Sequence, residues 1–196
     1  MRIYLAESRT QLLNLLSPYE LNESGTPVHI EPTIIDAALV HPAYPAILLG
    51  ESPQSFLTDF PKGGIVSFSA RLSPAITPFA QNAICIGLRD LKRKDRTALI
   101  QSRINAFSMK EISFTSLREA CDSIMAAARQ WEALLIHVNL DVLDSSIIPK
   151  SPCGGMTTRE LIYFLQRLRI LKNFRMAQVI PDKNDDVLAK LVIELL

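Results

Sequence analysis

The sequence predicts an α/β protein with three layers, in which a mostly parallel sheet is covered by helices on both faces. Short apolar segments alternate with amphipathic ones along the chain, as in consecutive strand–helix units. Residues 133–138 form a near-continuous apolar run, which is typical of a strand buried on both faces of a parallel sheet. Because 196 residues without a recognisable linker fit one domain, we expect a single domain over residues 1–196.

The expected strands are short apolar segments, and Gly50 and Gly87 each directly follow such a segment. Their ranges are 3–6, 46–49, 65–68, 83–86, 104–107, 133–138 and 176–180. Residues 17–45 are rich in proline and polar side chains, so we expect long surface loops there.

Four helices are expected between and after these strands. Two begin at capping boxes, Ser116 with Glu119 and Thr157 with Glu160, in which each side chain accepts a hydrogen bond at the helix start. They should extend to about residues 131 and 168. Residues 90–101 and 185–196 are the other two, and the last begins with acidic residues that suit the positive end of a helix dipole.

Composition excludes several classes of protein. The formal net charge is +1 and the sequence has no basic tail and no acidic block, so we expect no nucleic-acid partner. No apolar run approaches the roughly 20 residues that span a bilayer, so we expect no membrane association. Cys85, Cys121 and Cys153 form no zinc or redox motif, which favours reduced thiols in a cytoplasmic protein.

The most specific motif is His137-Val-Asn139-Leu-Asp141-Val-Leu-Asp144, followed by a proline-containing loop and Gly-Gly-Met-Thr before a helix with Arg-Glu. It resembles the signature of the arginase/agmatinase/formimidoylglutamase (ureohydrolase) family. Segments at 45–53, 66–73, 84–90 and 108–111 follow in the order of that family. The resemblance is clearest over residues 45–196, and it implies an arginase-like fold in a chain that is short for the family.

The resemblance implies a dinuclear manganese site in which a bridging hydroxide attacks a guanidinium or similar carbon. The family's six ligand positions match Ser52 or Pro53, Ser69, Arg71, Ser73, Asn139 and Asp141. Only Asp141 keeps a ligand side chain, and a guanidinium cannot bind a metal ion. Gln178 stands where relatives place a glutamate that pairs with the substrate guanidinium. We therefore expect no metal and no cofactor.

Three functions are compatible with this pattern. The first is a non-catalytic protein with a structural, regulatory or oligomer-partner role, assembling with itself or with a ureohydrolase paralogue. The second is a hydrolase of altered chemistry acting on a guanidino, amidino or other C–N substrate. It would use Asp141, Asp144, Glu51 or Cys153 in the remodelled cleft, with Asp141 and Asp144 as the catalytic candidates. The third is a protein that binds an amino acid or a polyamine without turnover. The remodelled cleft would contain Arg71, Asn139, Asp141, Gly154, Gly155 and Gln178.

Several of these residues also allow simpler interpretations. Asp141 and Asp144 could hold the strand–loop junction through hydrogen bonds to backbone N–H groups. Arg71 either pairs with Asp141 in the cleft or faces solvent. His137 fits a hydrogen-bonded core histidine as well as a ligand. A nucleophilic Cys153 would need an adjacent base, and the sequence places none beside it.

Overall fold

The computed structural model describes residues 2–5, 15–16, 29–31, 46–49, 56–102, 104–180 and 185–195. It contains one eight-stranded sheet in the order β2-β1-β3-β8-β7-β4-β5-β6, and every neighbouring pair in it is parallel. The strands are β1 (Arg2–Leu5), β2 (His29–Glu31), β3 (Ala46–Leu49), β4 (Gly64–Phe68), β5 (Ala83–Leu88), β6 (Asn105–Ser108), β7 (Leu134–Asn139) and β8 (Phe174–Ile180). The predicted parallel sheet is therefore confirmed.

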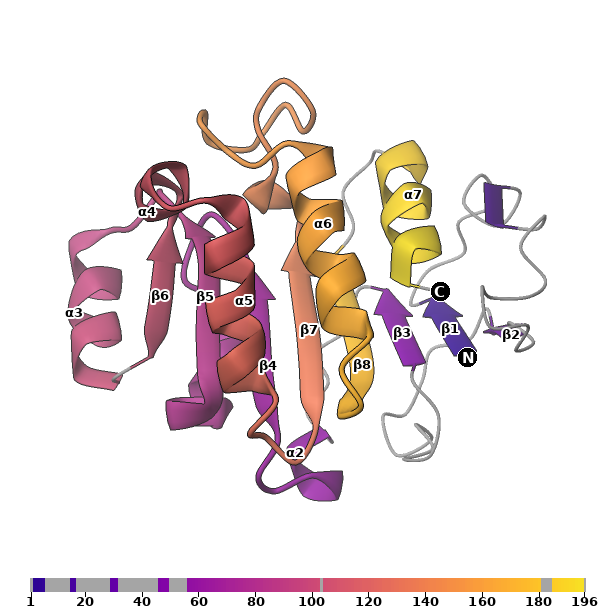
Figure 1. Cartoon of the computed structure of the whole chain (residues 1–196). Helices are drawn as coiled ribbons and strands as arrows, with labels where there is room; N and C mark the ends of the chain where they lie inside the picture. The colour runs from indigo at the N-terminus through magenta and orange to yellow at the C-terminus, as the bar shows by residue number, and fades with distance from the viewer. Residues whose placement is uncertain are drawn as a thin grey trace.

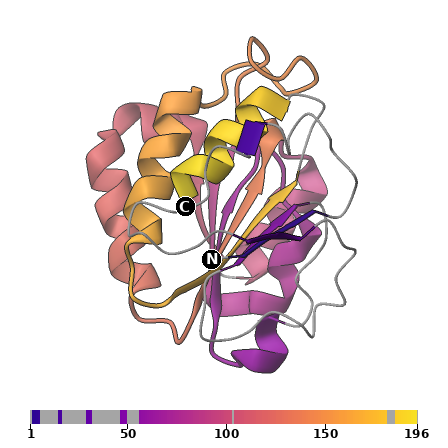
Figure 2. The ribbon, with the colours of Figure 1, turned by 90° about the vertical axis from the view of Figure 1, so that its right-hand side faces the viewer.

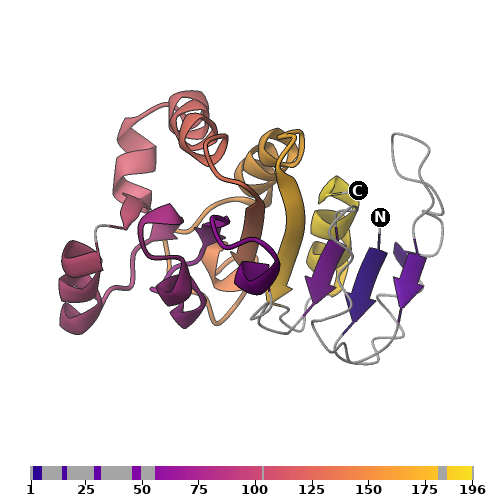
Figure 3. The ribbon, with the colours of Figure 1, turned by 90° about the horizontal axis from the view of Figure 1, so that it is seen from below.

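Helices lie on both faces of this sheet, as predicted (Figures 1, 2 and 3). They are α2 (Phe56–Asp59), η2 (Pro74–Asn82), α3 (Arg93–Ser102), α4 (Met109–Phe114), α5 (Leu117–Ala128), η3 (Leu140–Val142), α6 (Thr158–Arg169) and α7 (Asp185–Leu195). Apolar side chains of α5, α6 and α7 share one core with Phe68 and Val138, whereas α2 and η2 share a second core with Ile65 and Leu135. Successive strand residues point to opposite faces, so each central strand contributes to both cores.

The capping boxes at Ser116 and Thr157 are formed as predicted. The helix expected from residue 90 begins later, at Arg93. The sequence did not predict β2, which lies inside the stretch expected to be loops, or the helical elements α2, η2, α4 and η3. Among the described residues, no helix is long and apolar enough to cross a bilayer.

Candidate functional site

The candidate site lies where two neighbouring central strands end. In the register of β4 with β7, Phe68 pairs with Val138, so the residues that follow both strands leave the same edge of the sheet side by side. This edge holds the carboxyl ends of the strands and the loop after β7 (Figure 1). Asn139 ends β7, so the Asn139–Asp141 segment lies directly after the strand that was expected over residues 133–138. Ligand sites of parallel sheets lie at this edge.

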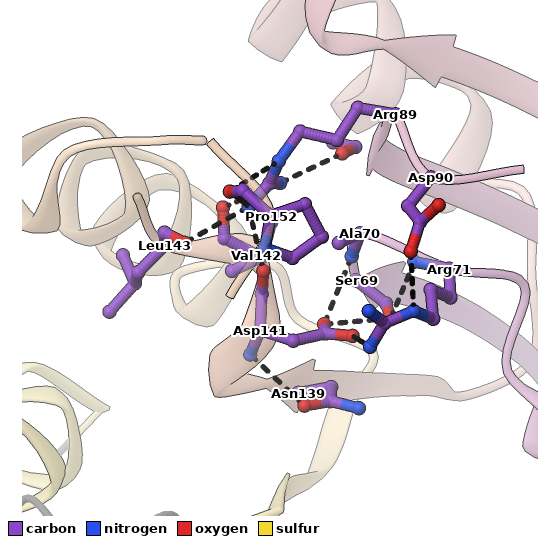
Figure 4. Close-up of polar contacts among 11 residues, drawn as sticks. Ser69, Ala70, Arg71, Arg89, Asp90, Asn139, Asp141, Val142, Leu143 and Pro152 are labelled. Carbon is purple, nitrogen blue, oxygen red and sulfur yellow. Dashed lines mark hydrogen bonds and ion pairs between the residues drawn. The ribbon is translucent and has the colours of Figure 1, made fainter. Parts of the chain in front are cut away.

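The Asp141 carboxylate is held by residues that follow β4 (Figure 4). Its Oδ1 accepts hydrogen bonds from Ser69 Oγ and from the Ala70 backbone N–H, both at 3.0 Å. The Asp141 N–H donates to Asn139 Oδ1 at 3.1 Å. Only 16% of the Asp141 side chain is exposed. The simpler interpretation, in which this carboxylate ties a strand end to its neighbour, therefore matches the geometry.

Arg71 lies in the cleft beside Asp141 while half of its side chain remains exposed. Its Nη1 is 3.6 Å from Asp141 Oδ2, and its Nε donates to Asp90 Oδ2 at 2.8 Å. Of the two alternatives for Arg71, the structure has the ion pair with Asp141 (Figure 4), but Asp90 is the nearer partner. The sequence places Asp90 just after β5, which adjoins β4, and that topology was the signal for its role.

Arg89 is a site residue that the sequence interpretation missed. Its guanidinium donates to the backbone carbonyls of Gly87, Asp141, Val142, Leu143 and Pro152, at 2.8–3.3 Å. These bonds fasten the loop after β7 to the end of β5 (Figure 4). Partial burial lowers the pKa of Arg89 from its usual value, but a guanidinium stays protonated in proteins, so the cation persists.

Asp144 has a structural arrangement that does not suit a catalytic acid. Its oxygens accept from the backbone N–H groups of Ser146, Gly154 and Gly155 at 3.0, 2.8 and 3.1 Å. These hydrogen bonds, with those from Ser146 the largest cause, lower the pKa of the Asp144 carboxyl well below its usual range. Gly154 adopts a φ of 75°, in the left-handed region that glycine tolerates. Asp144, Gly154 and Gly155 thus shape the loop.

His137 and Gln178 lie one row deeper in the sheet. They are paired in the register of β7 with β8, and both are buried. His137 Nδ1 is hydrogen-bonded to Ser67 Oγ at 2.9 Å, and burial lowers the pKa of His137 to about 4. This geometry matches the core-histidine interpretation. Neither side chain lines the pocket described next.

A pocket of about 170 Å³ opens at the strand-end site. Three residues of its lining were predicted, Arg71, Asn139 and Asp141, and two polar ones were missed, Lys150 and Ser151. The full lining consists of Arg71, Asn139, Leu140, Asp141, Ile148, Lys150, Ser151 and Ile180. Cys153 is exposed and accepts a hydrogen bond from Ser145 at 3.3 Å, and it does not line this pocket.

The donor set at this edge does not fit two manganese ions. At the matched positions, the neutral Ser69 and the cationic Arg71 surround Asp141, and Asp141 is already bonded to protein donors. Within the described ranges, no three His, Cys, Asp or Glu side chains come together in a way that could hold a metal ion. The other predicted candidates, Glu51, Ser52 and Pro53, lie outside the described residues.

The parallel α/β/α fold and its strand-end site define a ureohydrolase-like protein, and comparisons with known proteins identify the family. The Arginase family model matches residues 17–181. This chain belongs to the arginase family. An arginase of Coccidioides posadasii is 28% identical over 111 residues, a match that covers 55% of this chain and 34% of that protein. The matched stretch thus spans about a third of the curated relative's length.

Solved structures share the fold at low sequence identity. The arginase from Bacillus subtilis superposes with a TM-score of 0.79 at 14% identity, covering 100% of this chain and 96% of that chain. The arginase from Bacillus cereus gives 0.81 at 14% identity, with 99% and 96% covered. The formimidoylglutamase from Bacillus subtilis gives 0.77 at 14% identity, with 99% and 84% covered. At such identity, the likeness establishes the fold alone.

Proposed function

We propose that this chain is a non-catalytic member of the arginase family with a structural or regulatory role, acting as an oligomer partner. One observation carries the proposal. The Asp141 carboxylate, which in the family pattern would face a metal ion, accepts from Ser69 and Ala70 and faces the Arg71 guanidinium. A cation supplied by the chain therefore stands where the family pattern places a metal ligand.

The substitutions at this site support each other physically. Carboxylates that converge without a metal repel one another, and replacing them with Ser69 and Asn139 removes that repulsion. The remaining carboxylate is then balanced by one guanidinium, which cannot bind a metal ion and which repels it at close range. A dication would keep too few protein ligands to compete with water.

Urea release from arginine and agmatine, and formamide release from formiminoglutamate, test this proposal in the presence of Mn²⁺. We expect no turnover, and well below one equivalent of Mn²⁺ after dialysis. The matched control is the quadruple variant Ser69→Asp, Arg71→His, Ser73→Asp and Asn139→Asp, which should gain Mn²⁺ affinity. Stoichiometric Mn²⁺ in the unmodified protein, or turnover that Asp141→Asn abolishes, would contradict the proposal.

The oligomer-partner role rests on surface features at the β6 end of the sheet. Ile100 of α3 and Phe114 of α4 are 81% and 83% exposed, and α3 buries none of its residues. Light scattering of the purified chain, alone and mixed with an intact ureohydrolase, checks this role, and a monomer in both samples would refute it.

Three free cysteines fit our proposal of a cytoplasmic protein, because disulfides are rare in that reducing compartment.

A further inference from the structure

Most of the polar residues that line the pocket at the strand-end site carry hydrogen-bond donors. Among its described polar lining residues are Arg71, Asn139, Lys150 and Ser151, and Asp141 is the one carboxylate. Arg71 and Lys150 are cations and Asp141 is an anion, so the lining carries a formal charge of +1. A family site that should attract dications has here acquired a lining that repels them.

Most side-chain donors of this lining have hydrogen-bonding capacity left among the described residues, whereas the Asp141 carboxylate already accepts hydrogen bonds from the protein. Asp141 Oδ1 already accepts two hydrogen bonds. The Arg71 side chain donates one hydrogen bond among the described residues, from Nε to Asp90, and its Nη1 is 3.6 Å from Asp141 Oδ2, which leaves Nη2 of its planar fork available to a ligand. Lys150 has neither a hydrogen bond nor an ion pair within the described part of the chain.

Two further groups of the lining add donors of fixed or buried position. Asn139 Oδ1 accepts from the Asp141 N–H, so its NH₂ group must face the other way (Figure 4). Ser151 is 7% exposed, and its buried Oγ has no hydrogen-bond partner among the described residues. A buried hydroxyl without a partner is costly, and a ligand acceptor would satisfy it.

We infer that this pocket binds a small molecule through an anionic carboxylate or phosphate group held between Arg71 and Lys150. Both groups offer acceptor oxygens to several donors at once, which makes charge-assisted hydrogen bonds. The volume of about 170 Å³ is below the roughly 300–1,000 Å³ of sites for drug-sized ligands, so the ligand is small. The inference rests on the proposed function, since a bound dication would occupy the same cleft.

Calorimetric titration of the full chain at constant ionic strength tests this inference. The probes are inorganic phosphate and acetate as anions, agmatine as a cation, and MnCl₂ alone. We expect saturable binding of at least one anion and none of agmatine, and the tighter anion distinguishes a phosphate from a carboxylate site. The variants are Lys150→Ala and Ser151→Ala, and the matched control is Lys172→Ala, which removes a lysine from a different pocket.

Lys150→Ala should weaken anion binding by about tenfold or more, since it removes one charge-assisted hydrogen bond, and Ser151→Ala should weaken it less. Lys172→Ala should leave it unchanged. The inference is overturned by the absence of saturable anion binding, by equal losses in Lys150→Ala and Lys172→Ala, or by tighter binding of agmatine. Stoichiometric Mn²⁺ uptake would instead overturn the proposed function, so the two failures are separable.

Discussion

Asp141→Ala removes the acceptor that Ser69 Oγ and the Ala70 N–H share. Ser69 is buried at 2% exposure, so its hydroxyl loses a partner in a place that water reaches poorly. Hydrogen bonds to charged groups contribute roughly 1.5–3 kcal/mol each, and some solvent will enter the vacated space. We therefore expect Asp141→Ala to lower the free energy of unfolding by about 2–4 kcal/mol.

Arg71→Ala should cost much less, although it removes the cation of the same pair. The Nη1–Oδ2 distance is 3.6 Å and half of the Arg71 side chain is exposed. At that separation, the Coulomb energy in a medium with the dielectric constant of water is about 1 kcal/mol, and exposed pairs contribute about 0.2–1 kcal/mol. We expect a loss of at most about 1 kcal/mol, and a coupling energy with Asp141 of about 0.5 kcal/mol.

Urea denaturation of the unmodified protein, both single variants and the double variant gives these three quantities in one cycle. Asp141→Asn serves as the matched control, because it keeps an acceptor for Ser69 and removes only the charge. If Arg71→Ala proved as damaging as Asp141→Ala, or the two losses were strictly additive, the hydrogen bonds and the ion pair would not have the relative weights assigned here.

Three further outcomes are expected. The pKa of His137 is lowered from 6.5 to about 4, so burial favours the neutral ring: its contribution is present above pH 6.5 and lost as the pH falls towards 4, by about 3 kcal/mol in all. Denaturation at several pH values should show this slope, and His137→Asn should flatten it. Gly87→Ala should lower the melting temperature more than Gly154→Ala. Both glycines have a positive φ, but a Cβ at Gly87 would lie 2.5 Å from Val142, whereas a Cβ at Gly154 would have nothing within 4 Å. Equal shifts in melting temperature would contradict this. Arg89→Met should speed amide hydrogen exchange across residues 140–156 while α5 stays protected, and unchanged exchange in that loop would show that these hydrogen bonds do not hold it.

The sequence predicted the central part of the fold because burial on both faces leaves a strong signal there. The strands β4 and β7 are apolar apart from Ser67, His137 and the terminal Asn139. Ser67 and His137 are hydrogen-bonded to each other. By contrast, β2 has three residues with one aliphatic side chain, and Pro78 inside η2 breaks the α-helical pattern. The short α4 begins with a capping box, Ser108 with Glu111, and this sequence pattern was a signal for the start of a helix.

The sequence allowed prediction of those site contacts that join two side chains at the ends of adjacent strands. Arg71 and Asp141 follow adjacent strands, so topology alone places them together. Arg89 was not predictable in the same way because its partners are backbone carbonyls, and any residue type presents those. Lys150 enters the pocket through the path of the loop after β7, which depends on tertiary contacts rather than on local sequence pattern.

The hydrogen bonds from Arg89 to the loop carbonyls hold the conformation of this loop without a metal ion. A side chain that stays charged throughout the physiological pH range fixes the backbone of Asp141, Val142 and Leu143 from within the chain. We therefore expect chelators and changes in manganese concentration to leave the backbone of this loop unaltered. Side chains around Asp141 can therefore be substituted without loss of the loop conformation, because Arg89 holds the loop backbone independently of them.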